Sequence, residues 1–256
     1  MAWRVSTLDG MVLSHLEFDL LWEELELGDH PYPLEVRSHG FTMDERDELG
    51  EQAFATLTQA GLIDGDALDP GLEERLGLLV RPRLSVDALL IGEVPLRVLA
   101  AAGTREAVLA VLDHAELALR PFPPDQLIGT VAEVVGDLPA GPGGAVRLPR
   151  QVFSDAMKAF AERGHSGFEW TLSQAGVSGR ATRALSTLAD SPRTCSGQLA
   201  ANGPRGRSPV LTLLDTEAGR YGLSVDARAG TQWVTVTPAD TNWLVDRLAE
   251  AVDRVR

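Results

Sequence analysis

The sequence is poor in cysteine, in basic residues and in long apolar runs, and each shortage argues against a class of protein. Its 256 residues include one cysteine, Cys195, so no disulfide can form within the chain and a reducing compartment is compatible with it. No apolar run approaches the roughly 20 residues that cross a membrane, and Met1–Val5 lacks the apolar core of a signal peptide. We therefore expect a cytoplasmic protein that does not insert into a membrane.

Positive charge is also scarce. Lysine and arginine together number 23, against 37 aspartates and glutamates, which gives a formal net charge of −14 and a pI of about 4.7. A surface of this sign repels phosphate backbones and anionic lipids, so we expect neither nucleic acid nor an anionic membrane as a partner. The hydrophobic fraction of 44% and the charged fraction of 23% are those of a globular protein with a sizeable core.

Motifs for catalysis, metals and cofactors are missing too. None of the five histidines has the helical spacing or the nearby cysteine of a zinc site. The acidic stretch Asp64–Glu74 lacks the ligand spacing of a calcium loop, and the glycine-rich Pro139–Gly144 lacks the surroundings of a phosphate-binding loop. His114 follows Asp113 as in an acid–base pair, but a turn explains both residues. Cys195 has neither a base nor an orienting group beside it. The sequence predicts no catalytic residue, no metal site and no cofactor.

Hydrophobic periodicity predicts helices alternating with strands. Ser14 and Glu17, like Thr42 and Glu45, have the spacing of a capping box, in which two side chains satisfy free backbone donors at a helix start. Apolar residues at helical spacing follow both caps. Helices are expected near residues 15–27, 43–60, 72–80, 125–138, 152–160 and 240–252. Strands are expected near residues 34–37, 84–91, 108–113, 117–121, 146–148, 198–201, 210–215, 221–225 and 233–237, with residues 92–105 as a loop.

The stretch Val108–Asp113 recurs as Val210–Asp215, and both read V-L-x-x-L-D. Similar elements surround each copy in the same order, from a proline–arginine turn before it to a helix opening on proline and aspartate after it. We interpret the chain as one domain of two repeats, at about residues 11–138 and 145–256, joined by a linker at 139–144. The alternative is a non-repetitive chain with a fortuitous echo. The predicted fold class is α/β, with the repeats packed about a pseudo-twofold axis.

Four stretches carry a family resemblance. They are FDLLWEEL at residues 18–25, GDHPYPLEV at 28–36, DTEAGRY at 215–221 and WVTVTPAD at 233–240. In this order, with a capped helix after the second and an amphipathic helix after the last, the chain resembles the EspG proteins, cytosolic chaperones of actinobacterial type VII (ESX) secretion. The resemblance spans about residues 16–252. It implies a central, mostly antiparallel sheet flanked by helical bundles, and binding of a helical secreted substrate of the PE–PPE type.

The resemblance also implies where the substrate binds. In the family, the loop between the second and third strands makes contact together with the nearby sheet and C-terminal helices, and that loop corresponds here to Gly92–Arg105. From the residues alone this segment is unusually apolar, and it either forms an exposed surface or tucks under as a short helix. The expected contact residues on it are Val94, Leu96, Val98 and Leu99. Trp233 is a further candidate, with a place in the core as its alternative.

Other functions stay open at this point. A small-molecule-binding or enzymatic α/β domain needs an enclosed pocket where the repeats meet, with convergent polar groups and a perturbed titratable residue. A structural homodimer exposes no partner site, and the sequence leaves both a monomer and a homodimer open. The basic loop with Arg205 and Arg207 is expected to be merely solvated.

Overall fold

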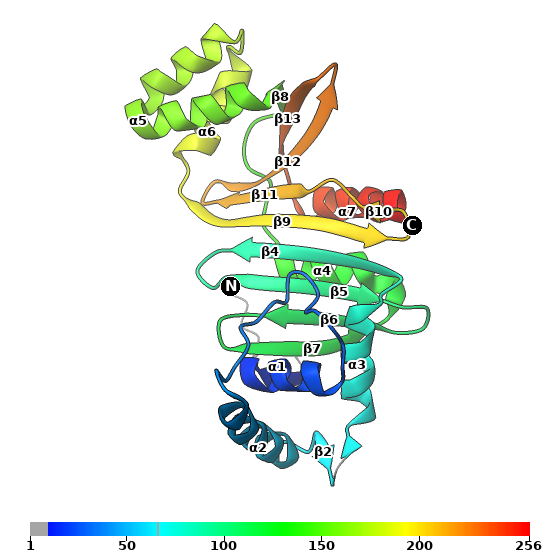
Figure 1. The fold of residues 1–256 in the computed structure, drawn as a ribbon. Helices are drawn as coiled ribbons and strands as arrows, with labels where there is room; N and C mark the ends of the chain where they lie inside the picture. The colour runs from blue at the N-terminus through cyan, green and yellow to red at the C-terminus, as the bar shows by residue number, and fades with distance from the viewer. Residues whose placement is uncertain (1–9, 66) are drawn as a thin grey trace.

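The chain forms one long antiparallel sheet with helices on both faces (Figure 1). The computed structural model describes residues 10–65 and 67–256; Met1–Val5 and Asp66, which belong to stretches considered above, lie outside the described residues. In spatial order the strands are β1 (Met11–Ser14), β7 (Glu116–Phe122), β6 (Ala107–Leu112), β5 (Leu96–Ala102), β4 (Leu84–Ile91), β9 (Arg193–Gly203), β11 (Leu211–Thr216), β12 (Gly219–Arg228), β13 (Thr231–Pro238) and β8 (Val146–Pro149). The short β10 (Gly206–Arg207) pairs with β9, while β2 (Ile63–Asp64) and β3 (Ala67–Leu68) form a separate hairpin.

The order of the strands is the same in both directions from the central β4–β9 pair. On one side follow β5, β6, β7 and then β1, the first strand of its half; on the other follow β11, β12, β13 and then β8. Two copies of one unit related by a twofold axis between β4 and β9 produce such an order. We therefore keep the division into repeats at about 11–138 and 145–256, with the linker at 139–144, as our interpretation.

The V-L-x-x-L-D echo does not mark equivalent strands of the two repeats. Val108–Asp113 overlaps β6, whereas Val210–Asp215 overlaps β11, whose counterpart in the sheet order is β5. The Asp113 carboxylate accepts hydrogen bonds from the backbone N–H groups of Ala115 and Glu116, at 2.8 and 3.0 Å, and so closes a turn. Strands buried on both faces draw on the same few aliphatic residues, which accounts for the coincidence.

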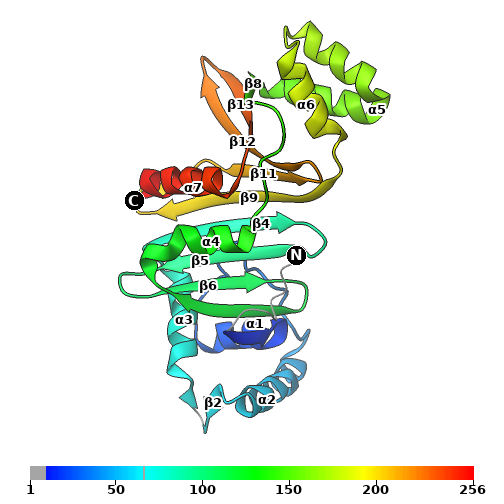
Figure 2. The same cartoon turned by 180° about the vertical axis from the view of Figure 1, so that it is seen from behind.

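Seven α-helices occur among the described residues. They are α1 (His15–Glu24), α2 (Met43–Gln59), α3 (Pro70–Val80), α4 (Leu127–Val135), α5 (Arg150–Gln174), α6 (Arg180–Asp190) and α7 (Thr241–Val255), with a 3₁₀ turn, η2 (Pro124–Gln126), before α4. One face of the sheet carries α4 and α7, as the rear view shows (Figure 2). The other face carries α1–α3 at one end and the α5–α6 pair at the other (Figure 1).

None of the helices in the described residues is long and apolar enough to span a membrane.

Three hydrophobic cores follow from this arrangement. Alternate residues of the strands point to opposite faces, so Leu96 and Val98 of β5 pack under α4 and α7 while Leu99 and Ala101 pack under α1 and α3. The third core lies under α5 and α6 and includes Phe168. The predicted fold class, a mixed fold with a central antiparallel sheet between helical layers, is confirmed.

Two predicted segments differ from the structure. Residues 92–105 are not a single loop, because β5 (Leu96–Ala102) occupies the middle of that range, and only 92–95 and 103–105 turn between strands. Its Ala-rich sequence has low strand propensity and its apolar run has no clear period, so pattern alone does not identify it as a strand. Residues 34–37, expected as a strand, form no ladder, although Leu34 is buried. The Leu34 N–H donates to the carbonyl of Pro31 at 2.7 Å, within a turn, instead of to a neighbouring strand.

Local signals were more reliable at helix starts. The Ser14 hydroxyl accepts a hydrogen bond from Glu17 N–H at 3.2 Å, and the Glu17 carboxylate accepts one from Ser14 N–H at 2.7 Å, so this capping box is confirmed. At α2 the Thr42 hydroxyl caps Glu45 N–H, but the Glu45 carboxylate accepts from Phe41 N–H instead of Thr42. That second box is therefore only half formed.

Arg220 joins the end of α4 to the second repeat. Its side chain is 1% exposed and forms a two-pronged ion pair with Asp215, with Nε–Oδ1 at 2.6 Å and Nη2–Oδ2 at 2.9 Å. The remaining N–H groups donate to the carbonyls of Val135 and Gly136. These carbonyls belong to the last turn and C-cap of α4, where helical partners run out. Asp215 is thus an architectural residue.

Candidate partner-binding surface

The face that carries α1–α3 and α5–α6 is bare in the middle. Neither helical layer lies over β4 and β9 there, as Figure 1 shows. Residues paired across neighbouring strands share a face, and the register places Leu89 opposite Gln198, Gln198 opposite Thr212, and Ile91 opposite Ser196. We call these five residues the central strip.

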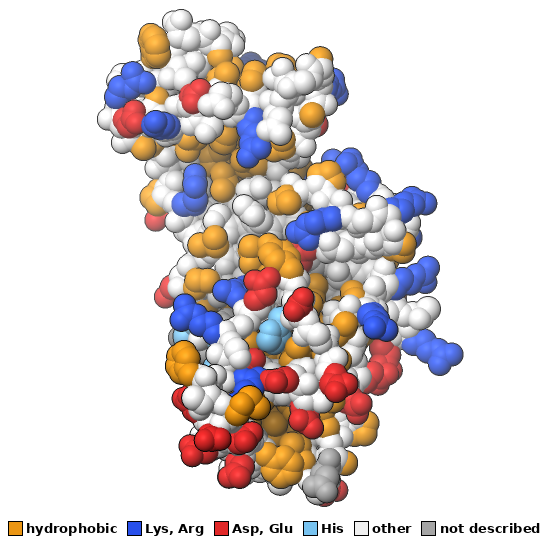
Figure 3. All heavy atoms as spheres, viewed as in Figure 1, with side chains coloured by type: hydrophobic (Ala, Val, Ile, Leu, Met, Phe, Trp, Pro, Cys, Tyr) orange, Lys and Arg blue, Asp and Glu red, His pale blue; other side chains and the backbone are white. Residues whose placement is uncertain are grey.

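The strip exists because β4 has two different faces. Val86, Ala88 and Leu90 point into the core under α4 and α7. The alternate residues include Leu89 and Ile91, which point the other way, and Ile91 is 64% exposed. In Figure 3 the surface below the projecting α5–α6 pair shows hydrophobic side chains with few charged ones. An apolar surface left between two helical walls is typical of a contact site.

An ion pair between a buried carboxylate and a partly exposed arginine borders the strip at the Asp87 end of β4. Asp87, two residues before Leu89 on β4, is 2% exposed. Its carboxylate accepts two hydrogen bonds from Arg207, at 2.5 and 2.8 Å, and one from Asn202 at 2.7 Å. The bonds to Asp87 raise the pKa of Arg207 above its ordinary value. Tyr32 lies against the same guanidinium, with 5.4 Å between Arg207 Cζ and the ring centroid. Arg207 is therefore a structural partner and not merely a solvated loop residue.

The core under α5 and α6 forms the opposite border. Leu214, which pairs with Ser196 in the ladder, is 6% exposed and belongs to that core. Tyr221 continues the same row of the sheet and donates its hydroxyl to the carbonyl of Pro142 at 3.1 Å. Burial raises the pKa of Tyr221. The strip is thus held between two fixed walls on a sheet whose central strands are paired on both sides.

The structure does not bring the five predicted contact residues together. Leu96 and Val98 are 5% and 0% exposed in one core, and Leu99 is 3% exposed in another. Their predicted role as exposed contacts is wrong, because a strand with helices on both faces leaves none of its aliphatic side chains in water. Val94 lies in the β4–β5 turn, partly buried against the core under α4 and α7.

Trp233 faces away from the central strip. It alternates along β13 with Val234 and Val236, which point into the core under α5 and α6, so its ring lies on the opposite face of the sheet. The guanidinium of Arg147 lies over the ring, 5.3 Å from its centroid. The sequence does carry a signal for the exposed site, because alternate residues of β4 face opposite sides and Ile91 falls on the side away from Val86, Ala88 and Leu90.

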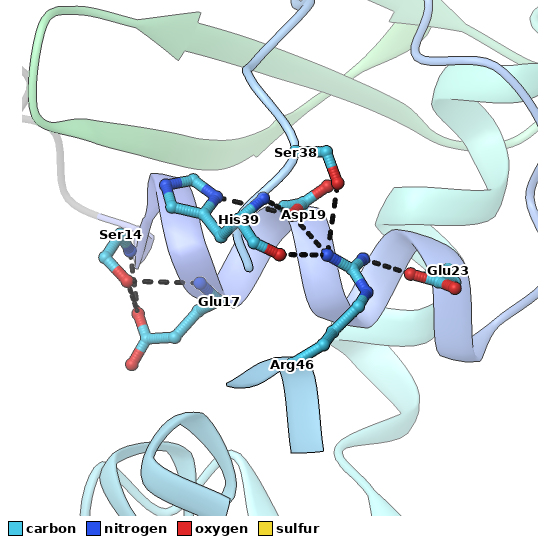
Figure 4. A network of polar contacts seen from close by, with 7 residues as sticks. All are labelled: Ser14, Glu17, Asp19, Glu23, Ser38, His39 and Arg46. Atoms are coloured by element: carbon cyan, nitrogen blue, oxygen red, sulfur yellow. Dashed lines mark hydrogen bonds and ion pairs between the residues drawn. The ribbon is translucent and has the colours of Figure 1, made fainter. Parts of the chain in front are cut away.

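A polar network joins α1 to α2 (Figure 4). The Asp19 carboxylate, 6% exposed, accepts from the backbone N–H of His39 at 2.8 Å and from Arg46 Nη1 at 3.2 Å. Arg46 also donates to Ser38 and pairs with Glu23. Each charged group already has protein partners, so this network fixes the start of α2 against α1 and offers no unused group for a substrate.

Two surface hollows are among the cavities of the described residues. One, of about 680 Å³, lies between the linker and α6, with Arg180 and Arg183 among its lining residues. The other, of about 460 Å³, lies where α3 begins and β7 ends, within the first repeat. Glu74 and Glu106 line the second hollow, and the charge of Glu106 raises the pKa of Glu74. Neither hollow lies at the β4–β9 junction, where the hypothesis of an enzymatic or small-molecule-binding domain requires a pocket.

Within the described part of the chain, the remaining candidates for catalysis or metal binding, Cys195 and the histidine and acidic side chains, lack the partners that such chemistry needs. Cys195 points into the core under α4 and α7, and its burial raises the pKa of the thiol, which disfavours the reactive thiolate. The side chain of His114 is 78% exposed at a turn, 3.9 Å from Asp113. Across residues 10–65 and 67–256, no three histidine, cysteine or acidic side chains are grouped to hold a metal ion.

Comparisons with known proteins give a family and a similar fold. Residues 14–250 match the model of the EspG family. The fold is similar to that of EspG5, a type VII secretion system chaperone of Mycobacterium tuberculosis solved in complex with a PE25–PPE41 dimer. The TM-score is 0.72, with 20% sequence identity over 96% of each chain. A search of curated proteins gives no match.

Proposed function

This chain belongs to the EspG family, and from that membership we propose that it is a cytosolic, non-enzymatic chaperone for a helical secretion substrate of the PE–PPE type. The substrate binds on the central strip and the chaperone shields its apolar surface until secretion. The observation that supports this most directly is the exposed Ile91, an aliphatic side chain on a rigid sheet between two helical walls. EspG5, with the same fold, was solved bound to a PE25–PPE41 dimer.

The sheet geometry favours a partner that binds through side-chain packing and not through backbone hydrogen bonds. Strands β4 and β9 are paired on both sides, so their backbone N–H and C=O groups are already bonded. A partner therefore cannot bind by adding a strand there. The remaining mode is packing of an apolar helical tip onto Leu89 and Ile91, with Gln198 and Thr212 available for hydrogen bonds to polar groups around it.

The proposed contact set replaces the one drawn from the sequence. Ile91 and Leu89 supply the apolar centre, and Val94, in the adjoining turn, is kept as a peripheral contact. Leu96, Val98 and Leu99 contribute indirectly, because their burial holds β5 against β4. A substrate on this site encounters a preformed surface, which lowers the entropic cost of binding.

The test is co-purification with a defined substrate. The chain is co-expressed with a PE–PPE pair encoded in the same genome and analysed by size-exclusion chromatography with light scattering. We expect a stable complex with the wild-type chain and none with Ile91→Asp. Val12→Asp is the matched control, since Val12 is a 37% exposed aliphatic on β1, four strands away. Complex formation that survives Ile91→Asp, or that is lost equally with Val12→Asp, contradicts the proposal.

A further inference from the structure

Large apolar side chains are exposed to solvent on α2 and just before it, at the end of the molecule remote from α5 and α6. Phe41, just before the helix, is 99% exposed; Met43 is 73% and Phe54 46% exposed. Only Ala53 and Leu57 of α2 are buried. In Figures 1 and 2 this helix lies at the extremity of the fold, beyond β7, and the described chain leaves its outer side open. Three large exposed apolar side chains on one short segment are typical of a surface that binds another protein.

Two of the exposed apolar residues and a glycine lie along one flank of α2. Met43, Gly50 and Phe54 follow one another at i, i+7 and i+11, which places them along one flank of α2. Eleven residues span about 16 Å, or three turns. Gly50 leaves a notch between the two larger side chains, and a Cβ added there meets nothing within 4 Å.

Acidic side chains line the solvent side of the same helix. Asp44, Asp47, Glu48 and Glu51 are all exposed, and none of them forms an ion pair within the described residues. Arg46 is the one basic residue of α2, and it turns inward to Asp19 and Glu23 (Figure 4). We call Phe41, Met43, Phe54 and these four acids the α2 surface.

The acidity of the chain is concentrated in the repeat that carries this surface. Residues 11–138 contain 25 aspartates and glutamates against 8 arginines, whereas residues 145–256 contain 11 acidic and 14 basic residues. The net negative charge of the protein therefore comes from the first repeat. Figure 3 shows the same contrast, with acidic side chains gathered in the lower half of the view.

We propose that the α2 surface binds a basic amphipathic helix of another protein, whose apolar face covers Phe41, Met43 and Phe54 and whose lysines or arginines face the acidic row. Charge complementarity selects this occupant. A second copy packed symmetrically on the same surface places acid against acid, which is repulsive. Because α2 and the central strip lie at different places on the fold, the chaperone holds substrate and this second partner at once.

A model peptide tests the proposal. The probe is an 18-residue helical peptide of leucine and lysine with its leucines on one face, and the control peptide is a scrambled isomer of equal charge. Fluorescence anisotropy with the full chain at 150 mM salt is expected to show at least tenfold tighter binding of the amphipathic isomer. Phe41→Ser/Phe54→Ser is expected to lower that affinity at least tenfold, while Ile91→Asp leaves it unchanged.

Three outcomes overturn the inference. Equal binding of both isomers means diffuse attraction to an acidic protein, and equal binding by the double serine variant places the site elsewhere. A dimer of the wild-type chain that dissociates with the double serine variant means that a second copy covers the surface. The isosteric variant Glu48→Gln/Glu51→Gln serves as a second test, since it weakens peptide binding without changing side-chain packing. Loss of substrate binding by Ile91→Asp is scored separately, so the two proposals can fail independently.

Discussion

Replacing Ile91 is the sharpest perturbation of the proposed substrate site. Full burial of an isoleucine side chain contributes about 1.5–3 kcal/mol. Ile91 has 64% of its surface exposed in the free chain, so covering it contributes about 1–2 kcal/mol to binding. Ile91→Ala is therefore expected to weaken substrate binding by about 5- to 30-fold, at tenfold per 1.4 kcal/mol.

Ile91→Asp adds a second penalty. A carboxylate without a partner in the contact costs a further 2 kcal/mol or so, taking the expected loss to about 100-fold or more. The fold itself changes little, because Ile91 is the last residue of β4 and points into solvent. We expect the free energy of unfolding of both variants to stay within about 0.5 kcal/mol of the parent.

The assay is calorimetric titration of the PE–PPE pair into parent, Ile91→Ala, Ile91→Asp and Val12→Asp chains, with urea unfolding of each. The predicted ranking of affinity is parent and Val12→Asp first, then Ile91→Ala, then Ile91→Asp. Equal affinities across the series refute the assignment of the strip. A loss of affinity that merely follows a loss of stability refutes the reasoning from exposed area.

Three further predictions concern the fold. Arg220→Met leaves Asp215 and two carbonyls without their buried cation and is expected to lower the free energy of unfolding in urea by about 3 kcal/mol; a change under 1 kcal/mol contradicts this. Gly222→Ala is expected to lower the free energy of unfolding by about 1–3 kcal/mol, because a Cβ there overlaps the Trp243 ring of α7. The melting temperature is expected to fall accordingly, and an unchanged melting temperature contradicts this packing. Burial of His30 between aromatic rings lowers its pKa below 6.5. As the pH falls, His30 is therefore protonated at a higher pH in the unfolded chain than in the folded chain. The free energy of unfolding is expected to decrease as the pH drops below 6.5, by at most about 1.4 kcal/mol per pH unit. His30→Phe is expected to flatten the stability curve between pH 7 and 5 relative to the parent, and parallel curves contradict this.

Local signals in the sequence were enough for the class of fold. Side-chain caps such as Ser14 with Glu17 act within four residues, so their geometry is visible in the order of letters. The strong amphipathic pattern of residues 125–138 likewise predicts α4, although the helix is shorter than expected, at Leu127–Val135. The pairing of strands is not local. The sheet order shows that β11 corresponds to β5, whereas the similar sequences at Val108 and Val210 match β11 with β6.

The candidate site was harder to predict for the same reason. Whether Leu96 or Ile91 is exposed depends on which helices cover each face of the sheet, and both residues are aliphatic ends of apolar runs in the sequence. Similarly, the partnership of Asp87 with Arg207 joins residues 120 positions apart. The resemblance to a family led to the kind of partner that we propose, but it placed the contact on a segment that this chain uses as a buried strand.

The central claim is that substrate sits on the strip between the two helical layers, and photo-crosslinking tests it directly. A photoreactive phenylalanine analogue is placed at Gln198, an exposed position in the middle of the strip, and at Thr58, an exposed position on α2, as control. Illumination of the complex with the PE–PPE pair is expected to crosslink the substrate from position 198 and not from position 58. Substrate captured from position 58, with none from position 198, contradicts the account.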